Sequence, residues 1–255
     1  MNINQKLSVM GLLCALVVTG CGGGGGSDDT SDQTQLPPST PQATAEGFWN
    51  GTASNGANVG LTVLENGQTY GYYTTSAGYI VGGVYGNATS SGNQLSGSMQ
   101  DFNLSTHTVQ SGTFTGSFVA KSSLNMQFSA GGTLSANYDP SYDQPPPSLP
   151  TIAGTYIGSA AIWNTATQTI PVVISPSGTI TQSTINGCGT SGTIQPRASG
   201  KNVFDVTLSF QGSNCALGNG ATVQGVAVYF PSNSGLIVMS ANATKTNGFI
   251  YSATK

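Results

Sequence analysis

Apolar and polar residues alternate in short runs along most of the chain, and turn residues separate the runs. In the run at 58–65, NVGLTVLE, every second residue from Val59 to Val63 is apolar. A period of two is typical of a β-strand with one buried face. No long stretch after residue 20 has the spacing of an amphipathic helix. The pattern therefore predicts an all-β protein.

The alternating runs fall into two groups of eight. In the first group the predicted strands are 47–54, 58–65, 68–75, 78–88, 94–103, 109–120, 123–130 and 133–138. In the second they are 153–163, 167–174, 178–185, 189–197, 203–211, 222–230, 235–243 and 248–253. We expect the ENG turn at 65–67 to be type I′, because Asn-Gly accepts positive φ.

Eight short antiparallel strands in about 100 residues form either an up-and-down barrel or a sandwich. Regular hairpin spacing favours the barrel, and closure removes the exposed sheet edges. In a barrel, the last strand, GFIYSATK at 248–255, pairs with the first strand of its module.

The two groups match each other in four blocks that keep the same order, which suggests a duplication. The alternative is chance matching of glycine-rich strands. Trp49 and Tyr156 occupy matched positions, and we expect each to lie in the floor of its module. The paired blocks are GFWNGTA at 47–53 with GTYIGSA at 154–160, LTVLENG at 61–67 with VVISPSG at 172–178, GNQLSGSMQDF at 92–102 with GKNVFDVTLSF at 200–210 without a gap, and TFTGSF at 113–118 with TVQGVA at 222–227.

A proline-rich segment, YDPSYDQPPPSLP at 138–150, lies between the two groups. Proline cannot donate to a sheet ladder and favours the extended polyproline conformation. We therefore expect two tandem β-modules, at 46–139 and 152–255, joined by a stiff linker at 140–151.

The chain begins with an apolar run of the length found in signal peptides. The run LSVMGLLCALVV at 7–18 follows Lys6 and is shorter than the roughly 20 residues that cross a bilayer. We predict that residues 1–20 form a signal peptide. Residues 22–45 hold almost no large apolar side chains and cannot offset the entropy of ordering. We therefore read 21–45, from Cys21 onward, as a disordered tether.

VTGC at 18–21 resembles the lipobox of bacterial lipoproteins. In that family the chain is cut before the cysteine, which is then acylated, so the resemblance implies a lipid on Cys21. Several acyl chains hold a protein stably on a membrane. Gly22, in place of the aspartate that retains family members at the inner membrane, implies the outer membrane, on its periplasmic face or at the cell surface. The alternative is an ordinary secreted protein with an unrelated cysteine.

The opening G-x-W at 47–49 also looks like the start of avidin- and lipocalin-type barrels. The two modules are similar in texture to the barrel halves of surface lipoproteins that bind host proteins. Both resemblances imply a barrel fold.

Cys188 and Cys215 both lie in the second module. An extracytoplasmic compartment is oxidising, so we expect a structural disulfide, contributing about 3 kcal/mol. The second module has no histidine, and a redox pair is usually closer in sequence. We therefore expect no metal site there.

The low content of charged residues indicates which classes of partner the protein can bind. Charged residues make up 6% of the chain, against about 25% in typical domains. Removing Lys6 with residues 1–20 takes the formal charge from −3 to −4. This excludes the basic footprint of a nucleic-acid binder. We expect the membrane, reached through the lipid, and a protein or glycan ligand as partners.

The sequence has few of the residues that catalysis needs. The single histidine, His107, lacks a nucleophile motif around it, no metal-ligand spacing occurs, and the glycine run precedes no helix. We therefore expect no cofactor, no metal and no catalytic residues. The modules share no aligned ionisable residue, which favours a binding or structural role in the envelope. The alternative is an envelope polysaccharide hydrolase in which Glu65 and Asp101 form the carboxylate pair.

Tyrosines cluster in TYGYYTTSAGYIVGGVYG at 69–86. A tyrosine ring offers contact area and its hydroxyl a hydrogen bond, which suits sugars and proteins. Tyr70 and Tyr72 share one strand face, and Tyr73 points the other way. The alternative is that these rings belong to the core or the barrel wall. The candidate ligand-binding residues are Tyr70, Tyr72, Tyr79 and Tyr85.

Overall fold

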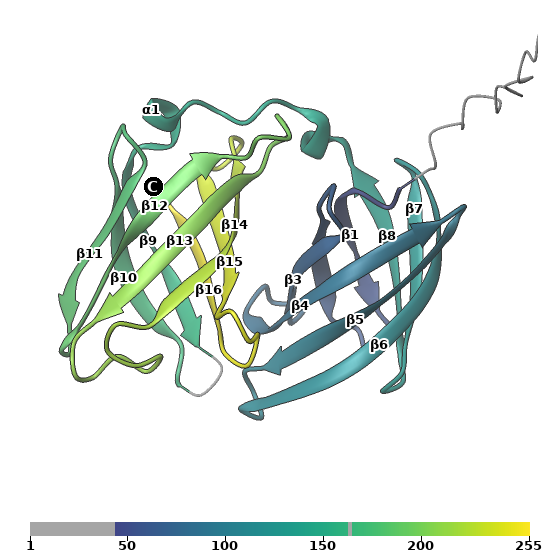
Figure 1. Cartoon of the computed structure of the whole chain (residues 1–255), viewed down its shortest axis with the longest axis horizontal. Helices are drawn as coiled ribbons and strands as arrows, with labels where there is room; N and C mark the ends of the chain where they lie inside the picture. Colours follow the sequence, from purple (N-terminus) through teal and green to yellow (C-terminus); the bar gives the residue numbers. More distant parts are fainter. Residues whose placement is uncertain (1–43, 163–164) are drawn as a thin grey trace, which may run out of the picture. The chain divides into compact units, whose positions relative to one another are not determined.

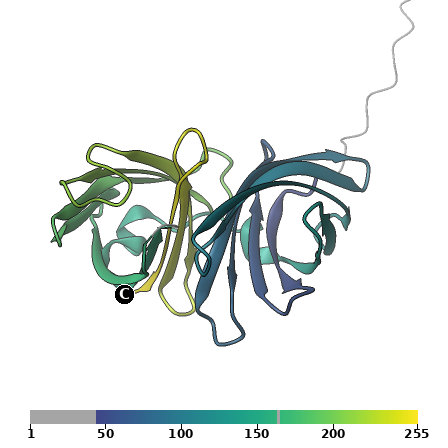
Figure 2. The same ribbon diagram turned by 90° about the horizontal axis from the view of Figure 1, so that it is seen from below.

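The computed structural model describes residues 44–162 and 165–255. They form two closed antiparallel barrels of eight strands each, which we call barrel 1 and barrel 2 (Figures 1 and 2). Strands follow chain order around each ring, and the last strand pairs with the first. The prediction of an all-β protein with two tandem barrels is confirmed, and the sandwich alternative is wrong.

The strands lie close to the predicted ranges, with differences at their ends. Barrel 1 consists of β1 (Gly47–Ala53), β2 (Asn58–Val63), β3 (Gln68–Thr74), β4 (Ile80–Ser91), β5 (Gln94–Asn103), β6 (Thr108–Val119), β7 (Ser123–Phe128) and β8 (Thr133–Asp139). Barrel 2 consists of β9 (Gly154–Ile162), β10 (Gln168–Ile174), β11 (Thr179–Ile185), β12 (Cys188–Pro196), β13 (Phe204–Gln211), β14 (Thr222–Phe230), β15 (Gly235–Ala241) and β16 (Gly248–Thr254).

Alternate residues of each strand face the barrel interior and build its core. In barrel 1, Leu61 and Val63 of β2 are buried together with Leu124 and Met126 of β7. The indole of Trp49 is fully buried among them. The barrel 2 core is filled more completely, with several aromatic rings. Its buried aromatic residues are Tyr156, Phe204, Phe210, Tyr229, Phe249 and Tyr251.

The turn between β2 and β3 differs from the predicted type. The N–H of Gly67 donates to the carbonyl of Leu64 at 2.9 Å, and Gly67 has φ 80°. Glu65 and Asn66 do not have positive φ. A type I′ turn requires positive φ at both central residues, so that prediction is wrong. The geometry is that of a four-residue turn whose final glycine takes the left-handed conformation.

The corresponding turn of barrel 2 has the same construction. Gly178 has φ 81°, and its N–H donates to Ser175 at 2.9 Å. Each turn glycine also accepts a bond from the strand after next, Gly67 from Ala88 at 2.7 Å and Gly178 from Ile194 at 2.8 Å. These bonds make Ala88 and Ile194 equivalent positions of the two barrels.

One of the four matched sequence blocks is out of register. The ungapped alignment of 92–102 with 200–210 pairs Phe102 with Phe210. Phe102 faces outward and packs against Tyr85, with ring centroids 5.0 Å apart, whereas Phe210 lies in the barrel 2 core. A one-residue slip exchanges the two faces of a strand. The alternation in this block is therefore offset between the barrels, and the ungapped alignment is wrong.

The predicted linker is folded against its neighbours. It contains a 3-10 turn, η1 (Pro140–Asp143), and a single helical turn, α1 (Leu149–Ile152). Tyr142 is buried edge-on against Phe48, with centroids 4.9 Å apart, and its hydroxyl donates to Glu46 at 2.9 Å. The prolines at 145–147 lie between the two turns, so only a short part of the segment acts as a spacer.

Two further features complete the fold. Cys188 and Cys215 form a disulfide with their Cα atoms 4.8 Å apart, which joins β12 to the loop after β13.

Ala45, at the end of the predicted tether, is fully buried, so packing begins before residue 46. Within residues 44–162 and 165–255, no helix has the length and apolar character needed to cross a membrane.

Candidate functional site: the cavity of barrel 1

Barrel 1 is filled at one end and hollow at the other. The cavity, of about 310 Å³, opens beside the β1–β2 and β7–β8 turns. Its volume is at the lower end of the range for small-molecule sites. The deeper wall is apolar and is formed by Leu61, Val84, Met99, Phe114, Met126 and Leu134. Polar side chains gather at the mouth, among them Asn55, Asn103 and Ser129.

The cavity exists because several inward-facing positions around it carry small side chains. Ala53, Ala57 and Gly112 all line it. Gly112 pairs with Met99 across the β5–β6 ladder. A side chain added at Gly112 would meet only the hydroxyl oxygen of Ser129 nearby, at 3.3 Å from its Cβ. The cavity therefore results from small side chains at these positions and not only from the distance between the strands.

The mouth of the cavity is held by hydrogen bonds between its turns. The hydroxyl of Ser54 accepts the N–H of Thr133 at 3.1 Å, and that of Ser129 accepts the N–H of Thr113 at 2.9 Å. The side chain of Asn103 accepts two backbone N–H groups of the β5–β6 turn, both at 3.0 Å. These bonds favour a rim that is formed before any ligand arrives.

A tyrosine and an aspartate meet inside the cavity. The hydroxyl of Tyr73 on β3 donates to the carboxylate Oδ1 of Asp101 on β5 at 2.8 Å, and both residues line the cavity. The Tyr73 ring crosses the intervening strand over Gly82, where even a methyl group would overlap it. Glycine at 82 is thus what allows the two side chains to reach each other.

The surroundings of Asp101 disfavour its charge. Burial raises the pKa of the Asp101 carboxyl, and the hydrogen bond from Tyr73 partly opposes that rise. Burial also raises the pKa of Tyr73, and the charge of Asp101 adds to the effect. Tyr73 is therefore a neutral donor at neutral pH. Among the described residues, the cavity lining includes no lysine, arginine or histidine, and Asp101 takes part in no ion pair.

The four tyrosines singled out from the sequence do not line this cavity. Tyr85 is buried on the outer side of barrel 1, where its hydroxyl donates to the carbonyl of Phe249 in barrel 2 at 3.2 Å. Tyr70 packs edge-on against Tyr85, with centroids 5.9 Å apart, and Tyr72 lies beside the same cluster. Tyr79 is 74% exposed. Whether any of them binds a ligand stays a prediction.

Tyr73 is a site residue that the sequence did not reveal, although the period of two places it on the other face of the strand from Tyr70 and Tyr72. Both faces of β3 are buried, one inside barrel 1 and one against barrel 2. Hydrophobicity alone could not tell which face was the interior.

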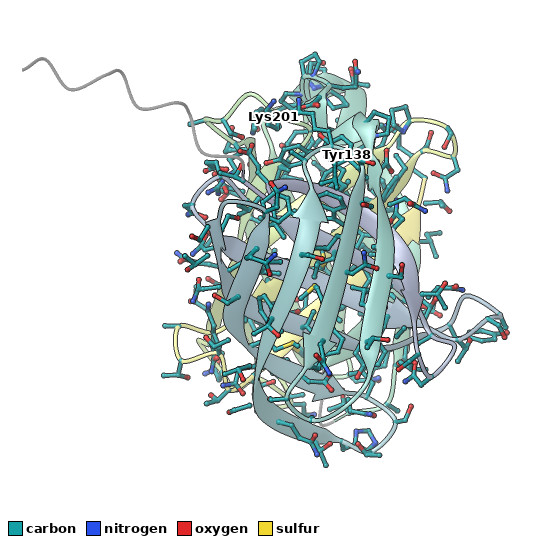
Figure 3. The ribbon with its side chains drawn as sticks, turned by 90° about the vertical axis from the view of Figure 1, so that its right-hand side faces the viewer. Tyr138 and Lys201 are labelled. Atoms are coloured by element: carbon teal, nitrogen blue, oxygen red, sulfur yellow. A yellow bond between two sulfur atoms is a disulfide. The ribbon has the colours of Figure 1, made fainter. Side chains whose placement is uncertain are left out.

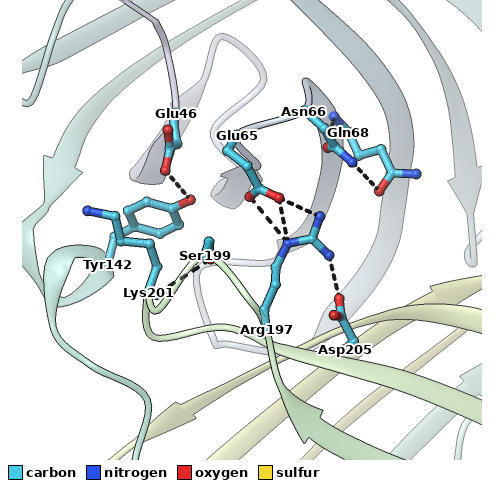
Figure 4. Close-up of polar contacts among 9 residues, drawn as sticks. All are labelled: Glu46, Glu65, Asn66, Gln68, Tyr142, Arg197, Ser199, Lys201 and Asp205. Carbon is cyan, nitrogen blue, oxygen red and sulfur yellow. Dashed lines mark hydrogen bonds and ion pairs between the residues drawn. The ribbon is translucent and has the colours of Figure 1, made fainter.

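The structure does not bring Glu65 and Asp101 together. Glu65 lies in the β2–β3 turn, at the end of the barrel away from the cavity mouth. Its carboxylate forms an ion pair of 2.8 Å with Arg197, which also binds Asp205 (Figure 4). The hydrogen bond from Arg197 lowers the pKa of Glu65, and the same contact raises the pKa of Arg197.

A second charged cluster surrounds Asp143 of η1. Its carboxylate accepts bonds from Lys121 at 2.7 Å, Lys201 at 2.8 Å and the Tyr138 hydroxyl at 2.9 Å. Tyr138 and Lys201 lie at the same end of the molecule in Figure 3. The two lysines hold the pKa of Asp143 well below its usual range.

Barrel 2 has a smaller hollow, of about 150 Å³, next to the disulfide. Phe210 and Phe249 line it and pack against each other, with centroids 5.6 Å apart. These rings occupy the space that is open in barrel 1.

The signal peptide at 1–20, the lipidation site Cys21 and the tether up to residue 43 lie outside the described residues. His107 lies in the β5–β6 turn with φ 53°. In the part of the chain that the structure describes, no group of three or more His, Cys, Asp or Glu side chains could hold a metal ion.

Comparison with known proteins adds little to this picture. No family model matches the sequence, and no curated protein is significantly similar to it. A crystal structure of a protein of unknown function from the DUF3598 family, from Nostoc punctiforme, aligns at 12% identity and a TM-score of 0.27. The alignment covers 83% of this chain and 96% of that one. A similarity at this level carries no argument about function.

Proposed function

We propose that this chain is a lipid-anchored binding protein of the bacterial outer membrane, and that barrel 1 holds a small ligand in its cavity. The observation that carries the binding role is the open, mostly apolar cavity of about 310 Å³ with a polar mouth. Apolar walls provide the favourable free energy of burial, and a few placed polar groups orient the ligand. A hollow in a core also lacks packing contacts, so it lowers stability unless it is filled.

A fluorescence titration tests the binding role. The probe is N-phenyl-1-naphthylamine, a neutral aromatic compound that brightens on entering apolar surroundings, added to the full-length chain carrying Cys21→Ser. We expect saturable brightening. Gly112→Leu should abolish it, because the added side chain enters the cavity.

The matched control for this titration is Thr115→Leu, which places a leucine side chain on the exposed outer face of β6 and should bind the probe normally. Equal probe binding by the two variants would contradict the proposal, as would the absence of saturable binding.

The anchor rests on the lipobox resemblance at 18–21. Several acyl chains on Cys21 would hold the barrels at the membrane, whereas one chain binds only marginally. Metabolic labelling with palmitate should mark the wild-type chain and Cys14→Ser, because Cys14 lies in the segment that is removed. Cys21→Ser should lack the label. A labelled Cys21→Ser chain would overturn the anchor and, with it, the outer-membrane location.

A further inference from the structure

We propose that the ligand of barrel 1 is a small lipophilic amine whose ammonium group binds the carboxylate of Asp101. This inference rests on the proposed function, because it names the class of ligand that the same cavity takes. It adds a charge requirement that an apolar hollow alone does not imply.

Asp101 has no counter-charge among the described residues that line the cavity. A carboxylate in an apolar cavity is costly unless a cation or several donors compensate it. Tyr73 supplies one hydrogen bond, at 2.8 Å to Oδ1. The described residues that line the cavity include no cation. A bound ammonium group would provide the missing compensation.

Barrel 2 has a phenylalanine at the position that corresponds to Asp101. Asp101 pairs with Val84 on β4, and Phe210 pairs with Thr190 on β12. Val84 lies four residues before Ala88, and Thr190 lies four residues before Ile194. Since Ala88 and Ile194 are equivalent, Asp101 and Phe210 hold equivalent inward positions.

It follows that the barrel does not need a carboxylate at this position. Barrel 2 fills it with a phenyl ring that packs against Phe249. Barrel 1 has the carboxylate of Asp101 at this position, and the space next to it is open. Groups that oppose stability without an evident compensating gain are typical of functional sites.

A hydrogen bond from Tyr73 on β3 holds the carboxylate of Asp101 in place. The Tyr73 hydroxyl binds one oxygen, and Gly82 leaves room for the ring to reach it. A fixed carboxylate loses less entropy when it binds a cation than a mobile one does. In this arrangement Tyr73 is a positioning residue, and Asp101 makes the contact with the ligand.

The lining and volume of the cavity determine what the ligand carries besides its ammonium group. Asp101 lies between Val84 on β4 and Gln110 on β6 in the strand ladder. Met99 and Phe114 add apolar wall elsewhere in the cavity, and the volume suits a body of one or two rings. The polar mouth beyond it tolerates a substituent that extends to solvent. Anionic ligands are disfavoured by repulsion from Asp101.

Competition against the fluorescent probe tests the inference with three compounds of one shape. These are 1-naphthylmethylamine, 1-naphthylmethanol and 1-naphthoate, each added at pH 7.5 to the full chain carrying Cys21→Ser and loaded with the probe. We expect the amine to displace the probe at about tenfold lower concentration than the alcohol, the fold-change expected for one charge-assisted hydrogen bond. The carboxylate should be the poorest competitor.

Two variants assign the preference to its source. Asp101→Asn keeps the shape and removes the charge, so the amine and the alcohol should compete equally. Tyr73→Phe keeps the charge and removes the hydrogen bond, so the amine should remain the better competitor. Equal competition in the unmodified cavity, or an amine preference that survives Asp101→Asn, would overturn the inference.

The outcomes distinguish the two proposals. If amine and alcohol displace the probe equally and Gly112→Leu blocks it, the cavity binds ligands but does not select amines. If Gly112→Leu leaves the probe in place, the proposed function fails together with the inference.

Discussion

Trp49 and Tyr156 make the same contact in their two barrels. The indole N–H of Trp49 donates to the carbonyl of Ala45, and the hydroxyl of Tyr156 donates to the carbonyl of Ile152. Both bonds are 2.8 Å long, both span four residues, and both aromatic side chains are fully buried. The ring of each residue thus closes one end of its barrel and fixes the segment that enters the first strand.

This shared contact predicts a cost for removing the donor. Tyr156→Phe leaves the buried carbonyl of Ile152 without its partner, so the free energy of unfolding should fall by about 1–2 kcal/mol. Trp49→Phe also leaves a void and should cost about 2–4 kcal/mol. Urea unfolding measures both, with Tyr79→Phe as an exposed control that should change nothing. An unchanged Tyr156→Phe would mean that the hydroxyl does not hold the chain.

Asp101→Asn should stabilise the ligand-free protein at neutral pH. Burial raises the pKa of Asp101 in the folded state above its usual value of 3.8. The folded state therefore binds the proton more tightly, and stability falls as pH rises between the unfolded and folded pKa values. The full deficit is present above the folded pKa, and the asparagine removes it.

Thermal unfolding across pH checks this prediction. The melting temperature of Asp101→Asn should exceed that of the parent at pH 7, and the difference should shrink as the pH falls toward 3.8. A variant less stable than the parent at pH 7 would show that the charge supports the fold, contrary to the role assigned to it.

The disulfide should matter mainly for barrel 2. Cys188 and Cys215 are 27 residues apart, so the cross-link should contribute about 3 kcal/mol by restricting the unfolded chain. The double variant Cys188→Ser/Cys215→Ser should unfold at lower urea concentration, and a reducing agent should no longer affect it. Probe binding in barrel 1 should persist in the folded variant. Identical urea midpoints with and without the bond would contradict this prediction.

The ion pair between Glu65 and Arg197 should show measurable coupling. The Arg197 side chain is only 14% exposed and binds Glu65 through two nitrogens. A double-mutant cycle with Glu65→Gln and Arg197→Gln should give about 1 kcal/mol, decreasing with added salt.

The comparison for this cycle is Lys121 with Asp143, where the lysine side chain is 64% exposed. We expect that pair to couple by less than about 0.5 kcal/mol. Equal coupling in the two pairs would mean that burial of Arg197 does not strengthen its contact.

Much of the fold was predictable because a barrel repeats one simple rule. Leu61 and Val63 are separated by the polar Thr62, and glycine occurs in many of the turns between strands, so strand positions and their number followed from the pattern. The duplication followed from matched blocks such as the one around Trp49. The error at Phe102 arose because both faces of β5 carry apolar residues, which hides the register.

The candidate site was harder to predict from the sequence than the fold. The sequence shows Asp101 as a candidate carboxylate, but its partner Tyr73 is 28 residues away and reaches it only because Gly82 lies between them. Tyr70, Tyr72 and Tyr85 are candidate ligand contacts in the sequence, yet they pack where the barrels meet. A single strand pattern does not show which of two buried faces encloses a cavity.

The central claim is that the barrel 1 cavity is the ligand site, and methionine methyl NMR tests it most directly. Met99 and Met126 line the cavity, whereas Met239 belongs to the cluster between the barrels. On addition of N-phenyl-1-naphthylamine to the full chain labelled at methionine methyl groups, the signals of Met99 and Met126 should shift and that of Met239 should not. A shift of Met239 with Met99 and Met126 unmoved would contradict the account.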